Sequence, residues 1–417
     1  MHTLYPVFDY VKKLGRAGQI NNELWMCYSA SGAAFQFEGK QLQVTLIGDD
    51  RCEQENMNEN LARVKVLVDG NCTHDLMMDE KEKKISIIGT QTKENHLVEI
   101  IKVSESAMST CGIRSMETDE DAVVRPAQQK ERCIEFAGDS ITCGYGVDDE
   151  VAEHSFKTAT EDATKAYAYL TAQALKADHS LVSLSGYGII SGYSGDGERR
   201  PDQLLPTYYE KMGFCYGSMN GEYPQNVSWD FSALQPDVVV INLGTNDQSF
   251  TREIESLCEE YCTAYQTFIR TIRRNNPNAY ILCMLGVMGE ALCPMAQKAV
   301  DRYRKETGDR AILRALHFFR ENKKAIIALM TEYTKKCSEP AADGDIHGTL
   351  YTRKDDCLYK LRFDGSAEDI ENYLNNNTAY KRAKAYYTLR CEDGIITACN
   401  FGYVFIKRKK EESDSEA

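Results

Sequence analysis

A serine in a tight turn bounded by glycines is the first residue of this chain whose setting predicts chemistry. Ser140 stands in the stretch Phe136-Ala137-Gly138-Asp139-Ser140-Ile141-Thr142-Cys143-Gly144-Tyr145-Gly146, in which a short apolar run ends in Gly-Asp-Ser. This order is typical of a turn at the carboxyl end of a strand, which leaves the hydroxyl free. We expect Asp139 to order the turn through hydrogen bonds. A nucleophilic Ser140 needs two further parts, an oxyanion hole and a histidine base.

Two later loops carry the donors that such a serine needs. The first is Ser183-Leu184-Ser185-Gly186-Tyr187-Gly188, and the second is Asn242-Leu243-Gly244-Thr245-Asn246-Asp247. Glycine lets a backbone N–H approach a ligand closely, and Asn246 carries a side-chain amide. The N–H groups of Ser140 and Gly186 and the Asn246 amide would together form a three-donor oxyanion hole. Each motif alone is weak, but three in this order strongly favour a site of nucleophilic catalysis.

The elements that position these loops alternate between strand and helix from Cys133 onward. The apolar patterns predict strands at 133–137, 181–184, 237–243 and 280–285, and helices at 160–177 and 254–272. Such alternation predicts a doubly wound α/β domain. Because the carboxyl ends of parallel strands meet at one edge of the sheet, we expect the three motifs to lie together there.

The first 120 residues have a different pattern, of short strands separated by polar turns. Phe35 and Phe37 alternate with polar residues, Val64, Val66 and Val68 point to one face, and Asp69-Gly70 marks a turn. This pattern predicts a β-sandwich or jelly roll over residues 1–120. Residues 121–132 are charged and contain Pro126, so we expect a linker there.

Composition narrows the class of function. The chain has 417 residues, a formal net charge of −14 and 42% hydrophobic residues, which argues against binding to nucleic acid. No run of 18 apolar residues predicts a membrane span, and the start of the chain lacks the features of a secretory signal, so we expect a cytoplasmic protein. The 15 cysteines form no CxxC pair, which indicates neither a metal site nor a disulfide framework. We expect no cofactor.

With these motifs in place, the sequence resembles the SGNH (GDSL-type) hydrolase superfamily. Gly138-Asp139-Ser140 matches its first block, Ser185-Gly186 its second and Gly244-Thr245-Asn246-Asp247 its third. The sequence around the serine and the stretch Thr158-Ala159-Thr160-Glu161-Asp162 are similar to those of the two-domain carbohydrate esterase family two. The members of that family are acetyl esterases that act on acetylated sugars. The resemblance covers about residues 20 to 335. It implies Ser140 as the nucleophile and the oxyanion hole named above.

The histidine base has two candidates among seven histidines. In this superfamily the histidine comes late, usually as His-Pro before the last helix. His317 follows an apolar run and precedes the helix-like residues 322–333, but Phe318 stands in the place of the proline. His347 lies in Asp345-Ile346-His347, with acid–x–His spacing, but a strand-like run follows it. Neither candidate matches the superfamily pattern fully, so both remain open. A missing aspartate ahead of the histidine does not exclude a base, because a serine–histidine dyad is a known variation on the triad.

The sequence therefore predicts a serine esterase that removes acetyl or similarly small acyl groups from a small carbohydrate. The domains would be a sandwich (1–120), a linker (121–132), a hydrolase domain (133–337), an unassigned α+β extension (338–406) and a charged tail (407–417). Trp229 is a weaker candidate for stacking on a sugar, and Tyr187 for lining the site. The alternative is a carbohydrate-binding relative without a working base. The oligomeric state is left open.

Overall fold

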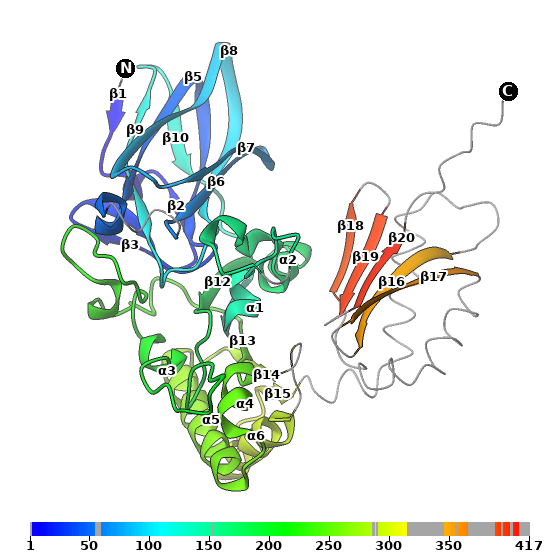
Figure 1. Ribbon diagram of the computed structural model, residues 1–417. Coiled ribbons are helices and arrows are strands. Elements are labelled where there is room, and N and C mark those ends of the chain that lie inside the picture. The colour runs from blue at the N-terminus through cyan, green and yellow to red at the C-terminus, as the bar shows by residue number, and fades with distance from the viewer. Residues whose placement is uncertain are drawn as a thin grey trace, which may run out of the picture. The chain divides into compact units, whose positions relative to one another are not determined.

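The computed structural model describes residues 2–54, 60–151, 154–285, 288, 291–314, 346–354, 357–365, 388–392, 395–400 and 403–407, the residues beyond Ile312 by their backbone alone. Figure 1 shows the elements in chain order. The chain forms two compact units. The first comprises Met1–Met284 and Pro294–Leu313, and the second Leu285–Cys293 and Arg314–Ala417.

Ten strands of the first unit form one hydrogen-bonded sheet, in the order β3-β4-β9-β5-β8-β6-β7 with β1, β2 and β10 paired to its members. The strands are β1 (His2–Leu4), β2 (Lys12–Leu14), β3 (Ala17–Ile20), β4 (Glu23–Met26), β5 (Gly32–Gly48), β6 (Arg63–Val68), β7 (Asn71–Met77), β8 (Glu82–Lys102), β9 (Cys111–Thr118) and β10 (Val123–Pro126). Short 3-10 turns lie at Val7–Asp9 (η1) and Asp50–Glu53 (η2).

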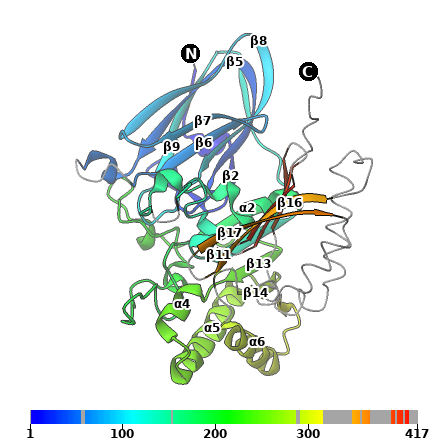
Figure 2. The same ribbon diagram turned by 45° about the vertical axis from the view of Figure 1, so that its right-hand side comes forward.

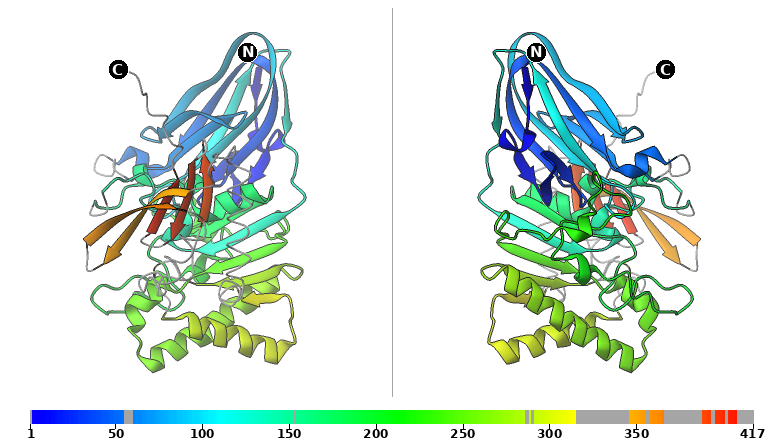
Figure 3. Two further views of the ribbon diagram at one scale, coloured as in Figure 1. Left: turned by 90° about the vertical axis from the view of Figure 1, so that its right-hand side faces the viewer. Right: turned by 90° about the vertical axis from the view of Figure 1, so that its left-hand side faces the viewer.

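The two longest strands shape this sandwich, which is seen from two sides in Figure 3. Strands β5 and β8 pair along almost their whole length, with register shifts at Gly39/Gln41 and Leu42/Gln43. Because a bulge bends a strand and increases its twist, β5 pairs with β2 and β10 in its first half and with β9 in its second. Phe35 and Phe37 point into the buried core. The predicted strand-rich amino-terminal domain is confirmed, and its arrangement is consistent with a jelly roll.

The expected linker at 121–132 contains the edge strand β10. Its residues pair antiparallel with β5, from Val123 opposite Glu38 to Pro126 opposite Phe35. An edge strand bonds on one side only, so it tolerates exposed charge and a terminal proline. That is why its sequence reads like a connector.

The α/β part of the first unit is a five-stranded sheet in the order β12-β11-β13-β14-β15. Its strands are β11 (Cys133–Gly138), β12 (Asp178–Ser183), β13 (Val238–Asn242), β14 (Tyr280–Met284) and β15 (Ile312–Arg314). The pairs that join β11 to β12, β11 to β13 and β13 to β14 are parallel. In chain order the arrangement is 2-1-3-4-5, so the doubly wound prediction is confirmed.

Helices cover both faces of this sheet (Figure 2). They are α1 (Ser140–Cys143), α2 (Tyr167–Ala174), α3 (Leu205–Tyr208), α4 (Thr245–Thr251), α5 (Glu255–Asn275) and α6 (Cys293–Thr307), with 3-10 turns at Thr158–Thr160 (η3), Ala163–Lys165 (η4) and Pro224–Asn226 (η5). Helix α2 packs in a core shared with sandwich residues such as Ile101 and Val103. The helix expected over 160–177 is shorter because the Asp162 carboxylate accepts from Thr164 N and holds η4 as a separate turn.

The second unit contains a five-stranded sheet in the order β17-β16-β20-β19-β18. The strands are β16 (Ile346–Lys354), β17 (Cys357–Gly365), β18 (Thr388–Glu392), β19 (Ile395–Asn400) and β20 (Tyr403–Lys407), and all neighbouring pairs are antiparallel. These strands fall within the expected α+β extension (338–406) and reach Lys407, while the charged tail beyond Lys407 lies outside the described residues. No described helix is long and apolar enough to cross a membrane.

Candidate active site

Ser140 is the first residue of helix α1, directly after strand β11 and its N-cap residue Asp139. The Asp139 carboxylate accepts from Ile141 N at 3.1 Å, so the expected role of Asp139 in ordering the turn is confirmed. Ser140 is half-buried. As the first residue of a helix it carries a backbone N–H without an acceptor inside the helix. The turn therefore presents a hydroxyl and a free backbone donor from the same residue.

The register of the sheet brings the other two motifs to the same edge. Gly138 at the end of β11 lies opposite Ser183 of β12 and Asn242 of β13. The loops that follow these three residues carry Ser140, Gly186 and Asn246. They meet where the chain order of the strands reverses, which is the usual ligand crevice of an open α/β sheet.

Gly186 and Asn246 are held in complementary ways. Gly186 has φ +81°, a conformation that favours glycine, and a Cβ added there would meet open space. Asn246 is buried, and its Nδ2 donates to the Tyr187 carbonyl at 2.8 Å. Because an amide nitrogen has two hydrogens, this bond fixes the plane of the side chain and leaves the second N–H for a ligand. The Tyr187 carbonyl thus orients the proposed side-chain donor.

Asp247 ties the third motif to the second loop. Its carboxylate accepts from the backbone N–H groups of Ile189, Ile190 and Ser191 at distances between 2.6 and 3.2 Å. Gly188 makes room for it, because a Cβ there would lie 2.7 Å from Asp247 Oδ2. The sequence marked Asp247 only as part of a motif. Its position inside the third block was the one signal of this structural role.

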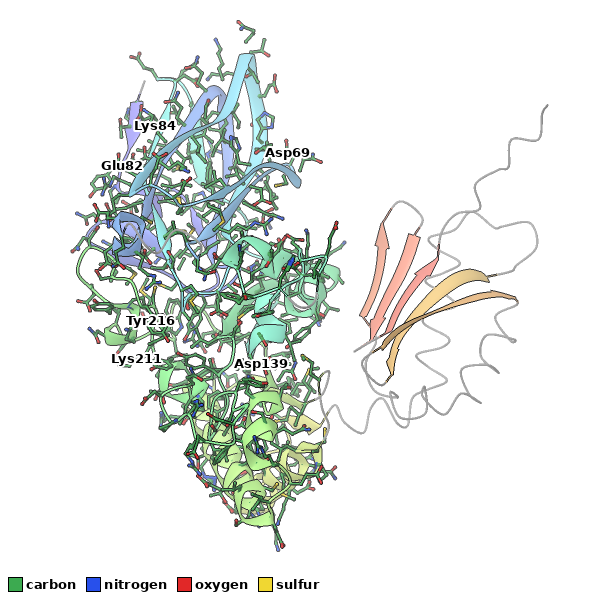
Figure 4. The ribbon with its side chains drawn as sticks, in the orientation of Figure 1. Asp69, Glu82, Lys84, Asp139, Lys211 and Tyr216 are labelled. Atoms are coloured by element: carbon green, nitrogen blue, oxygen red, sulfur yellow. The ribbon has the colours of Figure 1, made fainter. Side chains whose placement is uncertain are left out.

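The two aspartates behind the serine are fully buried without a cation among the partners described. Burial raises the pKa of Asp139 to about 7, and the negative charge of Asp247 contributes. Burial raises the pKa of Asp247 to about 6 against the three backbone donors that lower it. In Figure 4, Asp139 lies at the start of α1. The carboxyl groups thus organise the backbone near the serine while their own ionisation is made harder.

Neither histidine candidate can be placed beside the serine from the described side chains. His317 lies outside the described residues, and His347 lies on β16, of which only the backbone is described. The histidines described with side chains are His2, His74, His96, His154 and His179. His154 contacts Asp149, His96 contacts Asp69, and His179 contacts the Ala30 carbonyl. None of the five has a hydrogen bond to Ser140 in the part of the chain described with side chains.

The two weaker site candidates lie apart from one another. The Trp229 ring lies 5.3 Å from the Arg16 guanidinium and lines a cavity of about 680 Å³ with Cys133, Asp178 and Asp237, at the amino ends of the sheet strands. It is therefore not at the edge that carries Ser140, and the alternative interpretation, that it packs, fits the structure. Tyr187 is next to Gly186, so it does lie with the candidate site.

Tyr187 belongs to an aromatic cluster that the sequence did not indicate. Its ring centroid lies 6.0 Å from that of Tyr208 and 5.8 Å from that of Phe214, and Phe214 is 5.1 Å from Tyr216. Tyr216 is 52% exposed and lies on the segment after α3, as labelled in Figure 4. The cluster runs from the buried loop beside Gly186 out to solvent. It offers flat apolar faces with hydroxyl groups at their edges.

Among the residues described with side chains, one set gathers closely enough to hold a metal ion: Glu105, Cys143 and Glu161, whose ligand atoms lie within 4.8 Å of one another. Burial raises the pKa of the Cys143 thiol, and the negative charges of Glu105 and Glu161 add to this rise. The Lys102 ammonium donates to the carbonyls of Ser104 and Glu105 and supplies a nearby positive charge. Without an ion, burial and the like charge of the neighbouring carboxyl group favour the protonated form of this pair.

Comparison with known proteins defines the class to which this fold and site belong. The model of the GDSL-like lipase/acylhydrolase family matches residues 136–347, half of the chain, and the model of the carbohydrate esterase 2 N-terminal domain matches residues 14–127. The chain belongs to the GDSL-like lipase/acylhydrolase family. The resemblance seen in the sequence is confirmed, and both candidate histidines fall within the matched range.

The relatives are family two carbohydrate esterases. The chain is 30% identical to cellulase/esterase CelE of Acetivibrio thermocellus over 261 residues, which is 63% of this chain and 29% of that protein. It is 26% identical over 287 residues to an acetylxylan esterase / glucomannan deacetylase of Cellvibrio japonicus, covering 69% of this chain and 74% of that protein.

Solved structures show the same fold. A family two carbohydrate esterase from Clostridium thermocellum in complex with cellohexaose matches with a TM-score of 0.59 and 26% identity, over 75% of this chain and 87% of that one. The acetyl xylan esterase Est2A of Butyrivibrio proteoclasticus matches with a TM-score of 0.66 and 23% identity, over 75% and 89%.

Proposed function

We propose that this protein is a serine esterase that hydrolyses acetyl or similarly small acyl esters of carbohydrates through an acyl-serine. The observation that carries the proposal is the register of the sheet. It brings the turn of Ser140 and the loops of Gly186 and Asn246 to one edge, at the point where the strand order reverses. The match to the acylhydrolase family supports it.

The reaction follows from the roles that these groups can take. Ser140 Oγ attacks the ester carbonyl carbon while a histidine, His317 or His347, takes its proton. The oxyanion accepts hydrogen bonds from the backbone N–H groups of Ser140 and Gly186 and from the Asn246 amide. The C–O bond to the sugar breaks, and the leaving oxygen receives the proton from the histidine. Water, activated by the same histidine, then releases the acid and restores the serine.

The carbohydrate part of the proposal rests on the relatives and on the aromatic cluster. Two relatives are named as a cellulase/esterase and as an acetylxylan esterase / glucomannan deacetylase. The rings of Tyr187, Tyr208, Phe214 and Tyr216 begin next to Gly186 and reach solvent. Aromatic faces of this kind suit the C–H surfaces of a pyranose ring. An acylated oligosaccharide could therefore lie across the cluster with its ester at Ser140.

Assays of p-nitrophenyl acetate and acetylated xylan test the proposal. The wild type, Ser140→Ala, His317→Ala and His347→Ala variants are compared. We expect hydrolysis by the wild type, its loss in Ser140→Ala and its loss in one of the two histidine variants, which identifies the base. An inactive wild type, or full activity in Ser140→Ala, would contradict the proposed esterase.

A second candidate function is carbohydrate binding without turnover. It is favoured by the exposed end of the aromatic cluster, and a structural relative was solved with cellohexaose. Calorimetric titration of the wild type with cellohexaose and with xylohexaose checks this function. Binding by a wild type that hydrolyses neither ester would replace the esterase proposal, whereas binding lost in Tyr216→Ala together with a raised KM would place the oligosaccharide on the cluster of an active esterase.

A further inference from the structure

Glu105 belongs to the sandwich, yet its side chain reaches the second loop of the candidate site. It lies in the connection between β8, which ends at Lys102, and β9, which begins at Cys111. Its Oε2 accepts from Ser185 N at 2.9 Å, across 80 residues of sequence. Glu105 is 1% exposed. A buried carboxyl group from the amino-terminal domain is thus bonded to the residue immediately before Gly186.

A second carboxyl group holds Glu105 in place. Glu161 Oε2 accepts from Glu105 N at 2.6 Å, and Ala163 N donates to the Val103 carbonyl at 2.9 Å. Glu161 is fully buried. The segment around Glu161 therefore fixes the backbone of the sandwich loop, and the sandwich loop in turn fixes the backbone of the second loop.

The groups that face this carboxyl pair come from both domains. Among the described groups whose charge acts on the pair, Lys102 is the one cation. The side chains of Cys143, Tyr145 and Tyr187 also face the carboxyl pair. Burial and the mutual repulsion of the two carboxyl groups raise the pKa of Glu161. Glu105 Oε1 and Glu161 Oε1 are buried and have no hydrogen-bond partner among the described residues. Burial and like charge therefore favour a retained proton on the pair.

The bond to Ser185 lies one peptide before the peptide that carries the proposed oxyanion donor. The Gly186 N–H belongs to the peptide between Ser185 and Gly186. On one side, the preceding peptide is anchored by Ser185 N donating to Glu105. On the other, the following peptide is anchored because the Gly186 carbonyl accepts from Tyr193 N at 2.8 Å. Because glycine can adopt many backbone angles, the direction of its N–H depends on both anchors.

We propose that Glu105 of the sandwich is a positioning residue of the active site, which aims the Gly186 N–H at the oxyanion by holding Ser185 N. The inference rests on the esterase function proposed above and deepens it. The sandwich is then a working part of the catalytic centre, because the hydrolase sheet alone lacks one of the anchors of its own oxyanion hole.

Three variants test this role. Glu105→Leu keeps the approximate size of the side chain and removes the acceptor. Glu105→Gln keeps an oxygen that can accept from Ser185 N. Glu99→Leu is the control, because Glu99 is a half-buried carboxyl group on the preceding strand β8, and burial raises its pKa as well. Each variant is compared with the wild type by kcat and KM on p-nitrophenyl acetate, by thermal unfolding, and by hydrogen exchange of peptides that cover residues 182–188.

We expect Glu105→Leu to lower kcat about 100-fold with KM changed less than about threefold, since a misplaced oxyanion donor acts on the transition state. Glu105→Gln should recover most of that loss, and the Ser185 and Gly186 amides should exchange faster in Glu105→Leu alone. If Glu105→Leu has the same kcat as the control Glu99→Leu, the proposal is overturned.

Hydrogen exchange separates this proposal from the proposed function. If the wild type hydrolyses no ester, the esterase proposal fails, but faster exchange at residues 184–186 in Glu105→Leu still supports the anchoring role. If hydrogen exchange at these residues in Glu105→Leu is as slow as in the wild type and in Glu99→Leu, the anchoring role is overturned, whatever the activity. If Glu105→Leu does not fold, the same comparison is made with Glu105→Gln against Glu105→Asp, whose shorter side chain is expected to lose the bond and the activity.

Discussion

The two edges of the hydrolase sheet both bury charge, but they neutralise it in different ways. At the amino edge, where the strands begin, acids meet cations. Glu135 pairs with Arg16 at 3.2 Å and Asp178 with Lys12 at 2.6 Å. At the carboxyl edge, where the strands end, Asp139 and Asp247 accept from backbone N–H groups instead.

This difference separates stability from chemistry within one sheet. Arg16 and Lys12 come from the sandwich, so the amino edge joins the two domains through ion pairs. Glu135 is also bonded by Ser180 and Tyr209, which leaves it well satisfied. At the carboxyl edge the backbone donors are oriented by carboxyl groups, and no cation stands among the described partners to compete for an oxyanion. Substitutions at the carboxyl edge should therefore lower kcat, whereas substitutions at the amino edge should lower the free energy of unfolding.

The largest effect is expected at the carboxyl edge, from Ser140→Ala. Without the proposed nucleophile, kcat for p-nitrophenyl acetate should fall by at least about 10⁴-fold. The melting temperature should stay close to that of the wild type, because Ser140 is only half-buried. Ser232→Ala, at an exposed serine, serves as the control. A melting temperature that falls together with the activity would remove the contrast between the edges.

Arg16→Met should produce the next largest effect, at the amino edge and on stability. It leaves Glu135 buried without its cation, which typically costs about 3–5 kcal/mol of unfolding free energy. The kcat of the folded protein should remain within about twofold. Urea unfolding measures the change. The matched control is Arg199→Met, which breaks an exposed ion pair with Glu260 and should cost less than about 1 kcal/mol. Equal losses in both variants would contradict the role given to the amino edge.

Asn246→Ala should lower kcat by about 10²–10³-fold, because it removes one of the proposed oxyanion donors. KM should change little, since the donor acts mainly on the transition state. Asn71→Ala, at an exposed asparagine, is the control. Steady-state kinetics with p-nitrophenyl acetate provide the measurement, and a change confined to KM would show that Asn246 binds substrate without stabilising the oxyanion.

The smallest effect concerns pH and Asp139. Its folded pKa of about 7 lies above the value of 3.8 for an unperturbed aspartate. Between these values the native state keeps a proton that the unfolded chain has lost, so this group lowers the unfolding free energy as pH rises, by about 1.4 kcal/mol per pH unit. Asp139→Asn should lack this part of the slope. Urea unfolding at pH 5 and pH 6 tests it, with Asp230→Asn as the exposed control. A slope like that of the wild type would contradict the buried protonated state.

Local sequence predicted the carboxyl edge well and the amino edge poorly. Ser140, Gly186 and Asn246 each follow a short apolar strand within a few residues, so their meeting depends only on strands being parallel. The strand predicted at 237–243 is observed as Val238–Asn242, and the helix predicted at 254–272 as Glu255–Asn275. Short-range patterns were sufficient because the motif and the element that positions it are adjacent in the chain.

The parts that sequence missed depend on distant partners. In the sequence, Glu105 is one acidic loop residue among many, and only the fold places Ser185 beside it. Likewise, no local pattern predicts that Trp229 packs on the Arg16 guanidinium. Strand β10 looked like a linker because an edge strand resembles exposed coil. The base stays a prediction: His317 and His347 both lie beyond the residues whose side chains are described.

The pairing of Arg16 also has a consequence for synthesis on the ribosome. Its carboxylate partner lies 119 residues later, and the carbonyls of Tyr209 and Lys211 that it also contacts lie 193 and 195 residues later. The amino-terminal strands can form while the rest is still being made, but their guanidinium lacks its carboxylate partner until Glu135 has been synthesised, and its carbonyl acceptors until Tyr209 and Lys211 have followed. A nascent chain released before that point would carry an unneutralised charge on the surface destined for the domain interface.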